Sequence, residues 1–291
     1  MTEQLATGPA PRRLLSTYPS HLDDWLKCPA MYRLKHVDKV RRGPRTAVQS
    51  LGDSVHRALR AWWDLPLDRR DPVHAAAALR AEWIPVGYRD EAQSARWLTR
   101  ATGWVERYVA TLDPTDEPVG LERNVAFPTE AVAMNGRVDR IDRRRSEDGG
   151  EELVVVDYKT GRHLLTTTDA RSSLALASYA VAAQRSLRVR CRRVELHHLP
   201  TGEVVAWEFE QDALRRHVAR IDDMAAEIQD AVARRRETGD ADAFPARPGP
   251  LCGYCDVVRD CPTGIEALSG VLPAAWESLD RWEADEADAS D

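Results

Sequence analysis

The sequence predicts a mixed α/β fold, in which a sheet flanked by helices follows an N-terminal helical region. Two changes of pattern along the 291 residues indicate this fold class. Apolar residues recur at helical spacing over about the first 115 residues, and residues 121–211 then hold five β-branched or alternating runs. One Ala/Leu-rich segment of helical length separates the third run from the fourth. The order strand, strand, strand, helix, strand, strand favours a mixed sheet with one crossover over a regular βαβ repeat.

Helices are predicted where apolar residues recur every three to four positions. In the N-terminal region they cover residues 19–37, 47–63, about 72–84 and about 90–112. Pro29 interrupts the first of these segments, so we expect two short helices that meet at Cys28-Pro29. Residues 1–15 contain Pro and Gly without a periodic apolar pattern, which predicts a disordered N-terminus.

Strands are predicted from β-branched runs that lie between turn residues. The runs cover residues 121–130, 131–143, 151–160, 191–200 and 203–211. Asn135-Gly136 supplies one turn signal and the segment 146–151 supplies another. The crossover helix is expected over residues 172–186, and a long amphipathic helix over about 211–236.

This pattern predicts a disordered N-terminus, one large domain and a C-terminal helix with an acidic tail, over residues 1–15, 16–265 and 266–291. Within the domain we expect a helical part, an α/β core and a cysteine-rich loop, over residues 16–115, 116–240 and 241–265. The acidic tail, residues 283–291, is expected to be solvated and disordered.

The composition is that of an ordinary soluble protein, with 43% hydrophobic and 30% charged residues. The formal net charge of -6 argues against a protein that coats nucleic acid by bulk charge, but it does not exclude a nuclease with a local basic groove. No run approaches the roughly 18 apolar residues that span a bilayer, and the first residues lack the apolar core of a signal peptide. We therefore expect a cytoplasmic protein that does not act on membranes.

The apolar run that ends in Asp157, Tyr158 and Lys159 carries the first candidate site. Because side chains alternate along a strand, Asp157 and Lys159 share one face and Tyr158 points to the other. Such an acid and lysine are commonly an exposed ion pair of little consequence. Lysine is scarce in this chain, however, since only four of the 41 Lys+Arg residues are lysine, at positions 27, 35, 39 and 159. An exposed pair would tolerate arginine, so the lysine indicates a chemical requirement.

A second carboxylate, Asp139 in GRVDRID, precedes Asp157 by 18 residues, which is a hairpin distance. Two close carboxylates repel each other unless they hold a proton or a cation, and oxygen ligands suit Mg²⁺ or Mn²⁺. A bound cation polarises a phosphodiester and activates water, and a lysine beside it orients that water or offsets negative charge. Asp139, Asp157 and Lys159 are therefore the candidate catalytic residues of a metal-dependent hydrolase.

These motifs resemble the RecB-like branch of the PD-(D/E)XK nuclease superfamily. GRVDRID matches its GxxD acid, VVDYKTG its D-x-K signature and LGDSVHRAL its GxxxHxxL helix. The resemblance implies a restriction-endonuclease-like core, in which His56, Asp139 and Asp157 bind the cation together with the main-chain carbonyl of Tyr158. Taken alone, a helical histidine such as His56 is more often a core or surface residue than a ligand.

Accessory residues are also suggested by the resemblance. Family members carry a QxxxY helix after the D-x-K turn, and ALASYA keeps Tyr179 but has Ala175 in place of the glutamine. Tyr179 therefore either serves the site or packs on the sheet. Arg140 and Arg162 are candidates for phosphate contacts. Glu122 is a further acid near the motif strands, for which we expect a solvent-facing position.

The cysteines form a second constellation. Cys252, Cys255 and Cys261 follow a C-x2-C-x5-C pattern, and a cytosolic chain more often uses such a pattern for a metal than for disulfides. Three thiols lack a fourth ligand nearby. Similarity to the cluster-bearing RecB-like nucleases, of the AddB and CRISPR-associated types, implies that Cys28 completes a [4Fe-4S] cluster that ties the ends of the chain together. Zinc bound by four thiolates is the alternative, and Cys191 is expected to pack in the core.

The sequence thus predicts a Mg²⁺- or Mn²⁺-dependent DNA nuclease, acting as an exonuclease on single-stranded or unwound DNA ends in repair or recombination, with a helicase as a possible partner. Two alternatives stay open. One is a cluster-stapled subunit that binds DNA without cleaving it in a helicase-nuclease complex, although the retention of two acids and the lysine disfavours it. The other, within the nuclease class, is a role in CRISPR spacer acquisition.

Overall fold

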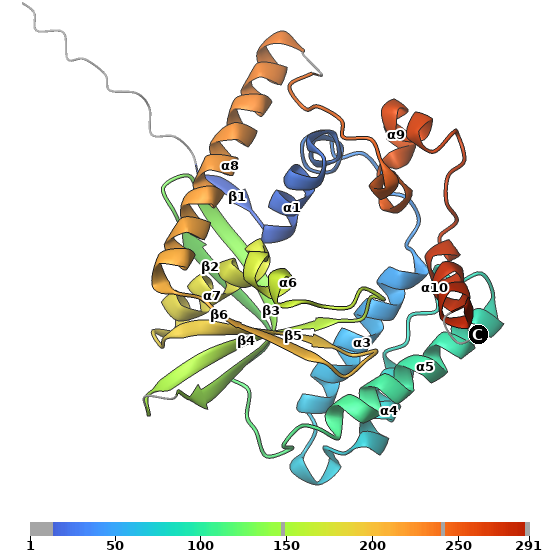
Figure 1. The fold of residues 1–291 in the computed structure, drawn as a ribbon, viewed down its shortest axis with the longest axis vertical. Coiled ribbons are helices and arrows are strands. Elements are labelled where there is room, and N and C mark those ends of the chain that lie inside the picture. Colours follow the sequence, from blue (N-terminus) through green and yellow to red (C-terminus); the bar gives the residue numbers. More distant parts are fainter. Residues whose placement is uncertain (1–13, 147–148, 240–241, 289–291) are drawn as a thin grey trace, which may run out of the picture.

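The computed structural model describes residues 14–146, 149–239 and 242–288. A six-stranded mixed sheet runs through this described part of the chain, and helices cover its two faces (Figure 1). The strands are β1 (Leu15–Thr17), β2 (Gly120–Pro128), β3 (Val132–Arg145), β4 (Glu151–Lys159), β5 (Cys191–His198) and β6 (Val204–Glu208). The mixed α/β fold that the sequence predicts is confirmed.

The sheet is organised around β3. Along one edge β3 pairs in parallel with β1 and antiparallel with β4, and along its other edge it pairs with β2. Next, β4 pairs in parallel with β5, and β5 pairs antiparallel with β6. A parallel pair needs a crossover connection, which α7 (Leu174–Leu187) supplies between β4 and β5.

Nine further helices occur in the described ranges. They are α1 (Pro19–Lys27), α2 (Pro29–Tyr32), α3 (Ala47–Trp63), α4 (Pro72–Ala81), α5 (Glu91–Val109), α6 (Thr167–Ser172), α8 (Gln211–Thr238), α9 (Pro262–Ala267) and α10 (Glu277–Asp288). The predicted break at Cys28-Pro29 separates α1 from α2. Among the helices described, none combines the length and the apolar character that crossing a membrane requires.

The two faces of β4 contribute to two separate apolar cores. Leu153 and Val155 pack in a core with α1, α7 and α8, whereas Val154 and Val156 pack in a core with α3, α4 and α5. A strand that is buried on both faces has a nearly continuous apolar run, as this one does. Tyr158 follows the second set, as the alternation of side chains predicts.

The turn expected at Asn135-Gly136 is wrong, because both residues lie inside β3. The chain turns between β2 and β3 at residues 129–131 instead, where the N–H of Thr129 donates to the carbonyl of Val132. A Cβ atom on Gly136 would lie 2.5 Å from Cε1 of Tyr179, closer than packed atoms approach. The glycine therefore admits a tyrosine ring against the strand and does not mark a turn.

Two expectations about the ends of the chain need correction. Leu15, which falls in the segment expected to be disordered, begins β1; the rest of that prediction, residues 1–13, lies outside the described residues. Most of the tail that was expected to be solvated belongs to α10, and residues 289–291 lie outside the described part. This helix is ordered because Leu279 and Trp282 are buried in the second core.

Candidate active site

The site lies where β3 and β4 separate. The ladder between the two strands ends at Arg140 opposite Val156, while β4 continues to pair with β5. Beyond that point the N–H of Tyr158 donates to a carboxylate oxygen of Asp139 at 2.8 Å, in place of a main-chain partner. The hairpin expected from the 18-residue spacing thus brings Asp139 beside the strand end that carries Asp157.

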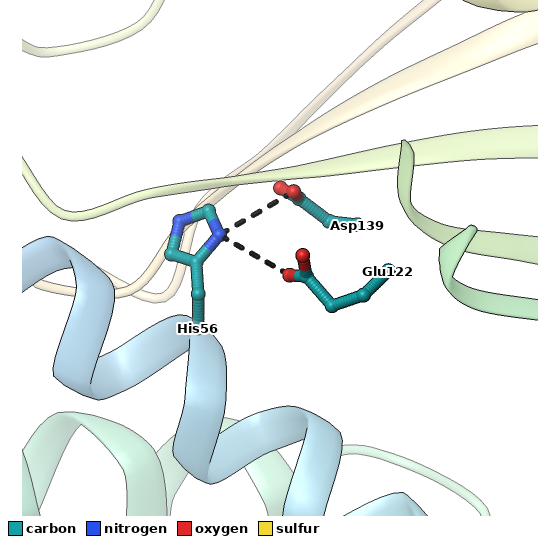
Figure 2. A group of neighbouring side chains, drawn as sticks. All are labelled: His56, Glu122 and Asp139. Atoms are coloured by element: carbon teal, nitrogen blue, oxygen red, sulfur yellow. Dashed lines mark ion pairs between the residues drawn. The ribbon is translucent and has the colours of Figure 1, made fainter. Parts of the chain in front are cut away.

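His56 reaches this opening from the middle of α3 (Figure 2). Its Nδ1 atom lies 3.4 Å from Asp139 Oδ1 and 3.9 Å from Glu122 Oε1. Its Nε2 atom lies 3.2 Å from the main-chain oxygen of Tyr158. One ligand atom each from His56, Glu122 and Asp139 falls within 4.8 Å of the other two, which is close enough to share one metal ion. We call these three residues, together with Asp157 and Lys159, the metal-site group.

The pKa of His56 reflects its acidic surroundings. Burial disfavours the charged imidazolium, but the hydrogen bond and charge of Asp139, with the charges of Asp157 and Glu122, outweigh burial and raise the pKa of His56 to about 9. Without a metal, the imidazole is therefore protonated at neutral pH. Metal binding replaces that proton, because only the neutral ring offers a lone pair.

Glu122 faces the site, so the expected solvent-facing position is wrong. Its side chain is 12% exposed, and Arg137 Nε lies 2.8 Å from its Oε2 atom. Its backbone has φ of 44°, a left-handed conformation that is unusual for a glutamate and that recurs at functional sites. Burial and the nearby charge of Asp139 raise the pKa of Glu122. No sequence motif marks Glu122, because a backbone irregularity, and not the spacing of residues, turns its side chain toward the site.

Asp157 and Lys159 form an ion pair on the same face of β4, as the alternation predicts. Burial is the largest effect on Asp157 and raises its pKa, although Lys159 opposes the shift. Asp139 differs: burial is again unfavourable to its charge, but His56 and the N–H of Tyr158 lower its pKa. Neighbouring carboxyls whose environments push their pKa values apart are typical of catalytic sites.

The charges of the metal-site group fit a divalent cation. Glu122 and Asp139 share the site with His56, and Asp157 lies beside them in its pair with Lys159. Arg137 pairs with Glu122 from the exposed side. An oxygen-rich set with one imidazole suits Mg²⁺ or Mn²⁺. The Asp157 Oδ2 atom is shielded from solvent and faces the Lys159 ammonium.

Two further residues lie near the group. Tyr179 packs on Gly136, and its pKa is raised by burial and then by the charges of Asp157 and Asp139. Asp23 of α1 was missed by the sequence analysis, because no motif marks it. Its pKa is raised by burial, and the charge of Lys159 acts on it in the opposite direction, so α1 contributes to the electrostatics of the site.

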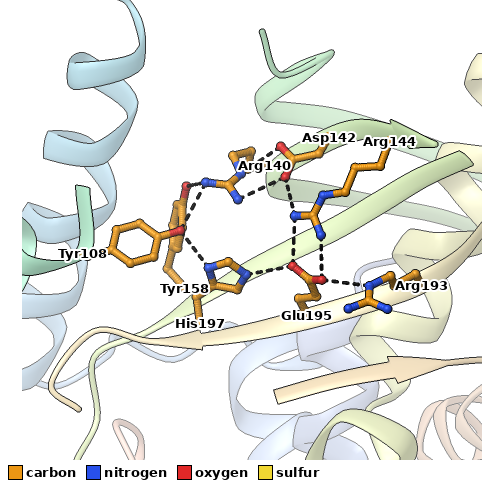
Figure 3. Close-up of polar contacts among 8 residues, drawn as sticks. All are labelled: Tyr108, Arg140, Asp142, Arg144, Tyr158, Arg193, Glu195 and His197. Atoms are coloured by element: carbon orange, nitrogen blue, oxygen red, sulfur yellow. Dashed lines mark hydrogen bonds and ion pairs between the residues drawn. The ribbon is translucent and has the colours of Figure 1, made fainter. Parts of the chain in front are cut away.

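Arg140 is not available to phosphates, which corrects the sequence-based expectation. Its side chain is 3% exposed and donates to the phenol oxygens of Tyr108, at 3.1 Å, and Tyr158, at 3.3 Å (Figure 3). It also pairs with Asp142 at 2.9 Å. This arginine network continues through the residues drawn in Figure 3, which are Tyr108, Arg140, Asp142, Arg144, Tyr158, Arg193, Glu195 and His197. Arg162, by contrast, is exposed and pairs with Asp285 of α10.

The four cysteines of the predicted cluster surround one pocket of about 190 Å³. Cys28 stands between α1 and α2, and Cys252, Cys255 and Cys261 come from the loop before α9. Backbone N–H groups donate to two of the sulphurs: that of Arg247 to Cys28 at 3.4 Å, and that of Gly264 to Cys261 at 3.3 Å. Cys191 is fully buried in β5, as predicted.

The sulphur atoms enclose a space and do not converge on a point. Within the described chain, no three of them lie within 4.8 Å of one another. A single tetrahedral zinc ion at about 2.3 Å from each sulphur would hold them roughly 3.8 Å apart. Lys35 and Asp24 line this pocket too. Lys35 Nζ lies 3.2 Å from Asp24 Oδ1 and 2.8 Å from Oδ1 of Asp256, the residue after Cys255.

A family model and one solved structure agree with this architecture. A family model described as the PD-(D/E)XK nuclease superfamily matches residues 17–262. A structure from Eubacterium rectale, named "Putative exonuclease", superposes with a TM-score of 0.50 at 10% identity, over 84% of this chain and 88% of that one. The structure of SSO0001 is similar over 87% of this chain and 88% of its own, with a TM-score of 0.34 and 12% identity. No curated protein matches the sequence.

Proposed function

The chain belongs to the PD-(D/E)XK nuclease superfamily, and on that premise we propose that it is a metal-dependent DNA nuclease of the RecB-like branch. We propose further that it acts as an exonuclease on single-stranded or unwound DNA ends in repair or recombination, with a helicase as its partner. Cytoplasmic location remains the expectation from the sequence. The observation that carries the proposal is the convergence of His56, Glu122 and Asp139 beside the Asp157–Lys159 pair.

Each residue of the metal-site group then has a role. His56, Asp139, Asp157 and the Tyr158 carbonyl would hold Mg²⁺ or Mn²⁺, with Glu122 as an additional acid. Such an ion polarises the phosphodiester and lowers the pKa of water. Lys159 positions the attacking water and stabilises the charge that develops on the phosphate. Its ammonium remains charged, since its pairing with Asp157 outweighs burial and raises its pKa.

We also propose that Cys28, Cys252, Cys255 and Cys261 hold a [4Fe-4S] cluster. The spacing of their sulphurs and the pocket of about 190 Å³ favour a multi-atom cluster over one zinc ion. N–H groups that donate to sulphur are a common feature of cluster sites. Its role is structural, because hydrolysis of a phosphodiester transfers no electrons. Brown protein with about four irons per chain after anaerobic purification is the expected result; colourless protein with zinc would overturn the assignment.

The test of the proposed activity is cleavage of end-labelled DNA. We expect Mn²⁺ or Mg²⁺ to support the shortening of a linear single-stranded oligonucleotide, and EDTA to abolish it. A closed circular single strand is the control for exonuclease action, because it offers no end. Cleavage of the circle would identify an endonuclease instead. Binding of DNA without cleavage under any metal would favour the non-catalytic subunit.

A further inference from the structure

The C-terminal helix α10 is acidic and anchored by apolar side chains. Leu279 is fully buried, and the Trp282 ring lies 5.0 Å from Trp97 and stacks on Trp104 at 5.8 Å. These contacts hold α10 beside α5, as Figure 1 shows. Apolar contacts therefore hold α10 in place independently of its charged side chains.

The acids of α10 pair with arginines from three places in the fold. Arg89, which precedes α5, pairs with Asp280 at 3.1 Å, and Arg96 of α5 pairs with Glu283 at 3.4 Å. The last turns add two more pairs, Arg100 with Glu286 and Arg162 with Asp285. The four arginines, Arg89, Arg96, Arg100 and Arg162, form what we call the arginine strip.

The arginine strip ends at the active site. Arg162 stands three residues after Lys159, in the segment that leaves β4. Asp285 and Glu286 are consecutive and point about 100° apart around the helix, so Arg100 and Arg162 reach the same turn of α10 from different sides. Arg89, Arg96 and Arg100 follow α5, and Arg162 extends the strip toward the strand end that carries Lys159.

The position of the last two of these acids, Asp285 and Glu286, is unfavourable for the helix itself. Five acids and one base, Arg281, lie between residues 277 and 286, and Asp285 and Glu286 stand near the C-terminal end, where the helix dipole disfavours negative charge. Helix stability therefore does not account for them. Guanidinium groups bind carboxylates and phosphates with the same forked geometry, so carboxylates in this place imitate a phosphate backbone.

We propose that the arginine strip binds the phosphates of the DNA strand entering the active site, and that α10 covers the strip as an acidic competitor. This inference rests on the proposed nuclease function. The side chains of the four arginines are 32% to 49% exposed, so they can exchange carboxylate for phosphate while Leu279 and Trp282 keep α10 docked. Exposed ion pairs are weak, which makes the exchange easy and dependent on salt.

The test neutralises the two acids nearest the active site, Asp285→Asn with Glu286→Gln. The matched control neutralises two exposed acids of α8, Asp223→Asn with Glu237→Gln, because α8 lies on the other side of the molecule (Figure 1) and the bulk charge changes equally. Binding of a fluorescent single-stranded oligonucleotide is measured by anisotropy in EDTA, which prevents cleavage. Thermal unfolding and tryptophan fluorescence check that α10 stays docked.

We expect the α10 variant to bind roughly three- to tenfold more tightly than the wild type at low salt, with the gain shrinking as salt increases. The control should change little, and adding Arg162→Gln to the α10 variant should remove most of the gain. Equal changes in both variants, or no change, would overturn the competitor role while leaving the nuclease proposal intact. Absence of binding and of metal-dependent cleavage in every variant would overturn the nuclease proposal and the strip with it.

Discussion

Two groups of ionisable side chains meet at Tyr158, and their charges are balanced differently; Figure 2 shows part of the first group and Figure 3 the second. The metal-site group sets three acids against Lys159 and a protonated His56, with the exposed Arg137 paired to Glu122. The arginine network sets two acids, Asp142 and Glu195, against three arginines. The main chain of Tyr158 contacts the first group and its phenol contacts the second.

The difference separates the tasks of the two groups. In the arginine network every acid has a guanidinium partner supplied by the protein, so the network is complete without a ligand. In the metal-site group part of the balancing positive charge is a proton on His56, which a metal ion would replace. We infer that the arginine network makes the strands rigid, and that the rigid strands hold the residues of the metal-site group in position.

The largest expected effect follows from removing the charges of the metal-site group. Asp157→Ala or Lys159→Ala should lower the rate of metal-dependent DNA cleavage by roughly three orders of magnitude or more, with the fold retained. Lys159→Arg should also lose most activity, because a guanidinium cannot replace a compact ammonium beside the reacting phosphate. The control is Glu151→Gln, at the other end of β4, where the acid forms an exposed pair with Arg143. Activity retained in both alanine variants would refute the assignment.

A large loss of stability is expected from breaking the arginine network. Arg140→Met removes a buried charge and leaves Asp142 with one partner, so the free energy of unfolding should fall by about 3–5 kcal/mol. Arg143→Met is the control on the same strand, because its pair with Glu151 is exposed and is worth at most about 1 kcal/mol. Urea unfolding monitored by tryptophan fluorescence compares the two. Similar losses in both variants would contradict the network's structural role.

The metal-site residues were more predictable than the network. Asp139 and Lys159 lie in short motifs at the ends of regular strands, so their approach follows from the hairpin spacing and the alternation of side chains. His56 is predicted by the family resemblance alone, and Glu122 is not predicted as a site residue, since a left-handed residue turns it toward the site. Arg140 is not placed for the expected phosphate contact, because the strand geometry buries it against Tyr108 and Tyr158.

Further along the chain, long-range packing decided what local patterns could not. Asn135-Gly136 has the composition of a turn, but the ring of Tyr179, more than forty residues later, requires the glycine. The acidic tail has the composition of a disordered segment, but its first residues continue a helix that Trp282, just before them, anchors on Trp97 and Trp104. Such partners are distant in sequence, and only the fold brings them together.

The two groups should also respond in opposite ways to loss of charge in the metal-free protein. Asp157→Asn should raise the free energy of unfolding, because burial makes the charge of Asp157 unfavourable and raises its pKa. Mn²⁺ at a hundred times its Kd should stabilise the wild type by about 2.7 kcal/mol and should stabilise this variant less. Mn²⁺ should still stabilise the Arg140→Met variant. Thermal unfolding with and without Mn²⁺ measures these shifts, and destabilisation of the metal-free Asp157→Asn protein would show that burial of the Asp157 charge is not unfavourable.

The pH dependence of stability is a smaller effect that also separates the two groups. The arginine network determines how stability changes at acid pH. Burial opposes the charge of Glu195, but hydrogen bonds from His197, Arg144 and Arg193 lower its pKa below the ordinary 4.5. A carboxyl whose pKa is lowered on folding stabilises the protein above its unfolded pKa, and that contribution is lost as pH falls through the lowered value. The Glu195→Gln variant should therefore have a lower free energy of unfolding than the wild type at neutral pH, and this difference should shrink as pH falls below about 4.5.

The metal-site group determines how stability changes at alkaline pH, where stability falls as pH rises. His56 has a pKa raised from 6.5 to about 9 in the folded protein, so its stabilisation is complete below 6.5 and is lost as pH rises toward 9. We expect metal-free wild-type protein to lose about 2–3 kcal/mol over that range, and His56→Gln to lose less. Mn²⁺ should remove the alkaline loss, because the ion takes the place of the proton. Urea unfolding between pH 5 and pH 9 tests this, with Glu195→Gln as the control that leaves the alkaline slope unchanged. If His56→Gln does not reduce the loss of stability with rising pH, another residue is the titrating group and His56 does not belong to the metal-site group.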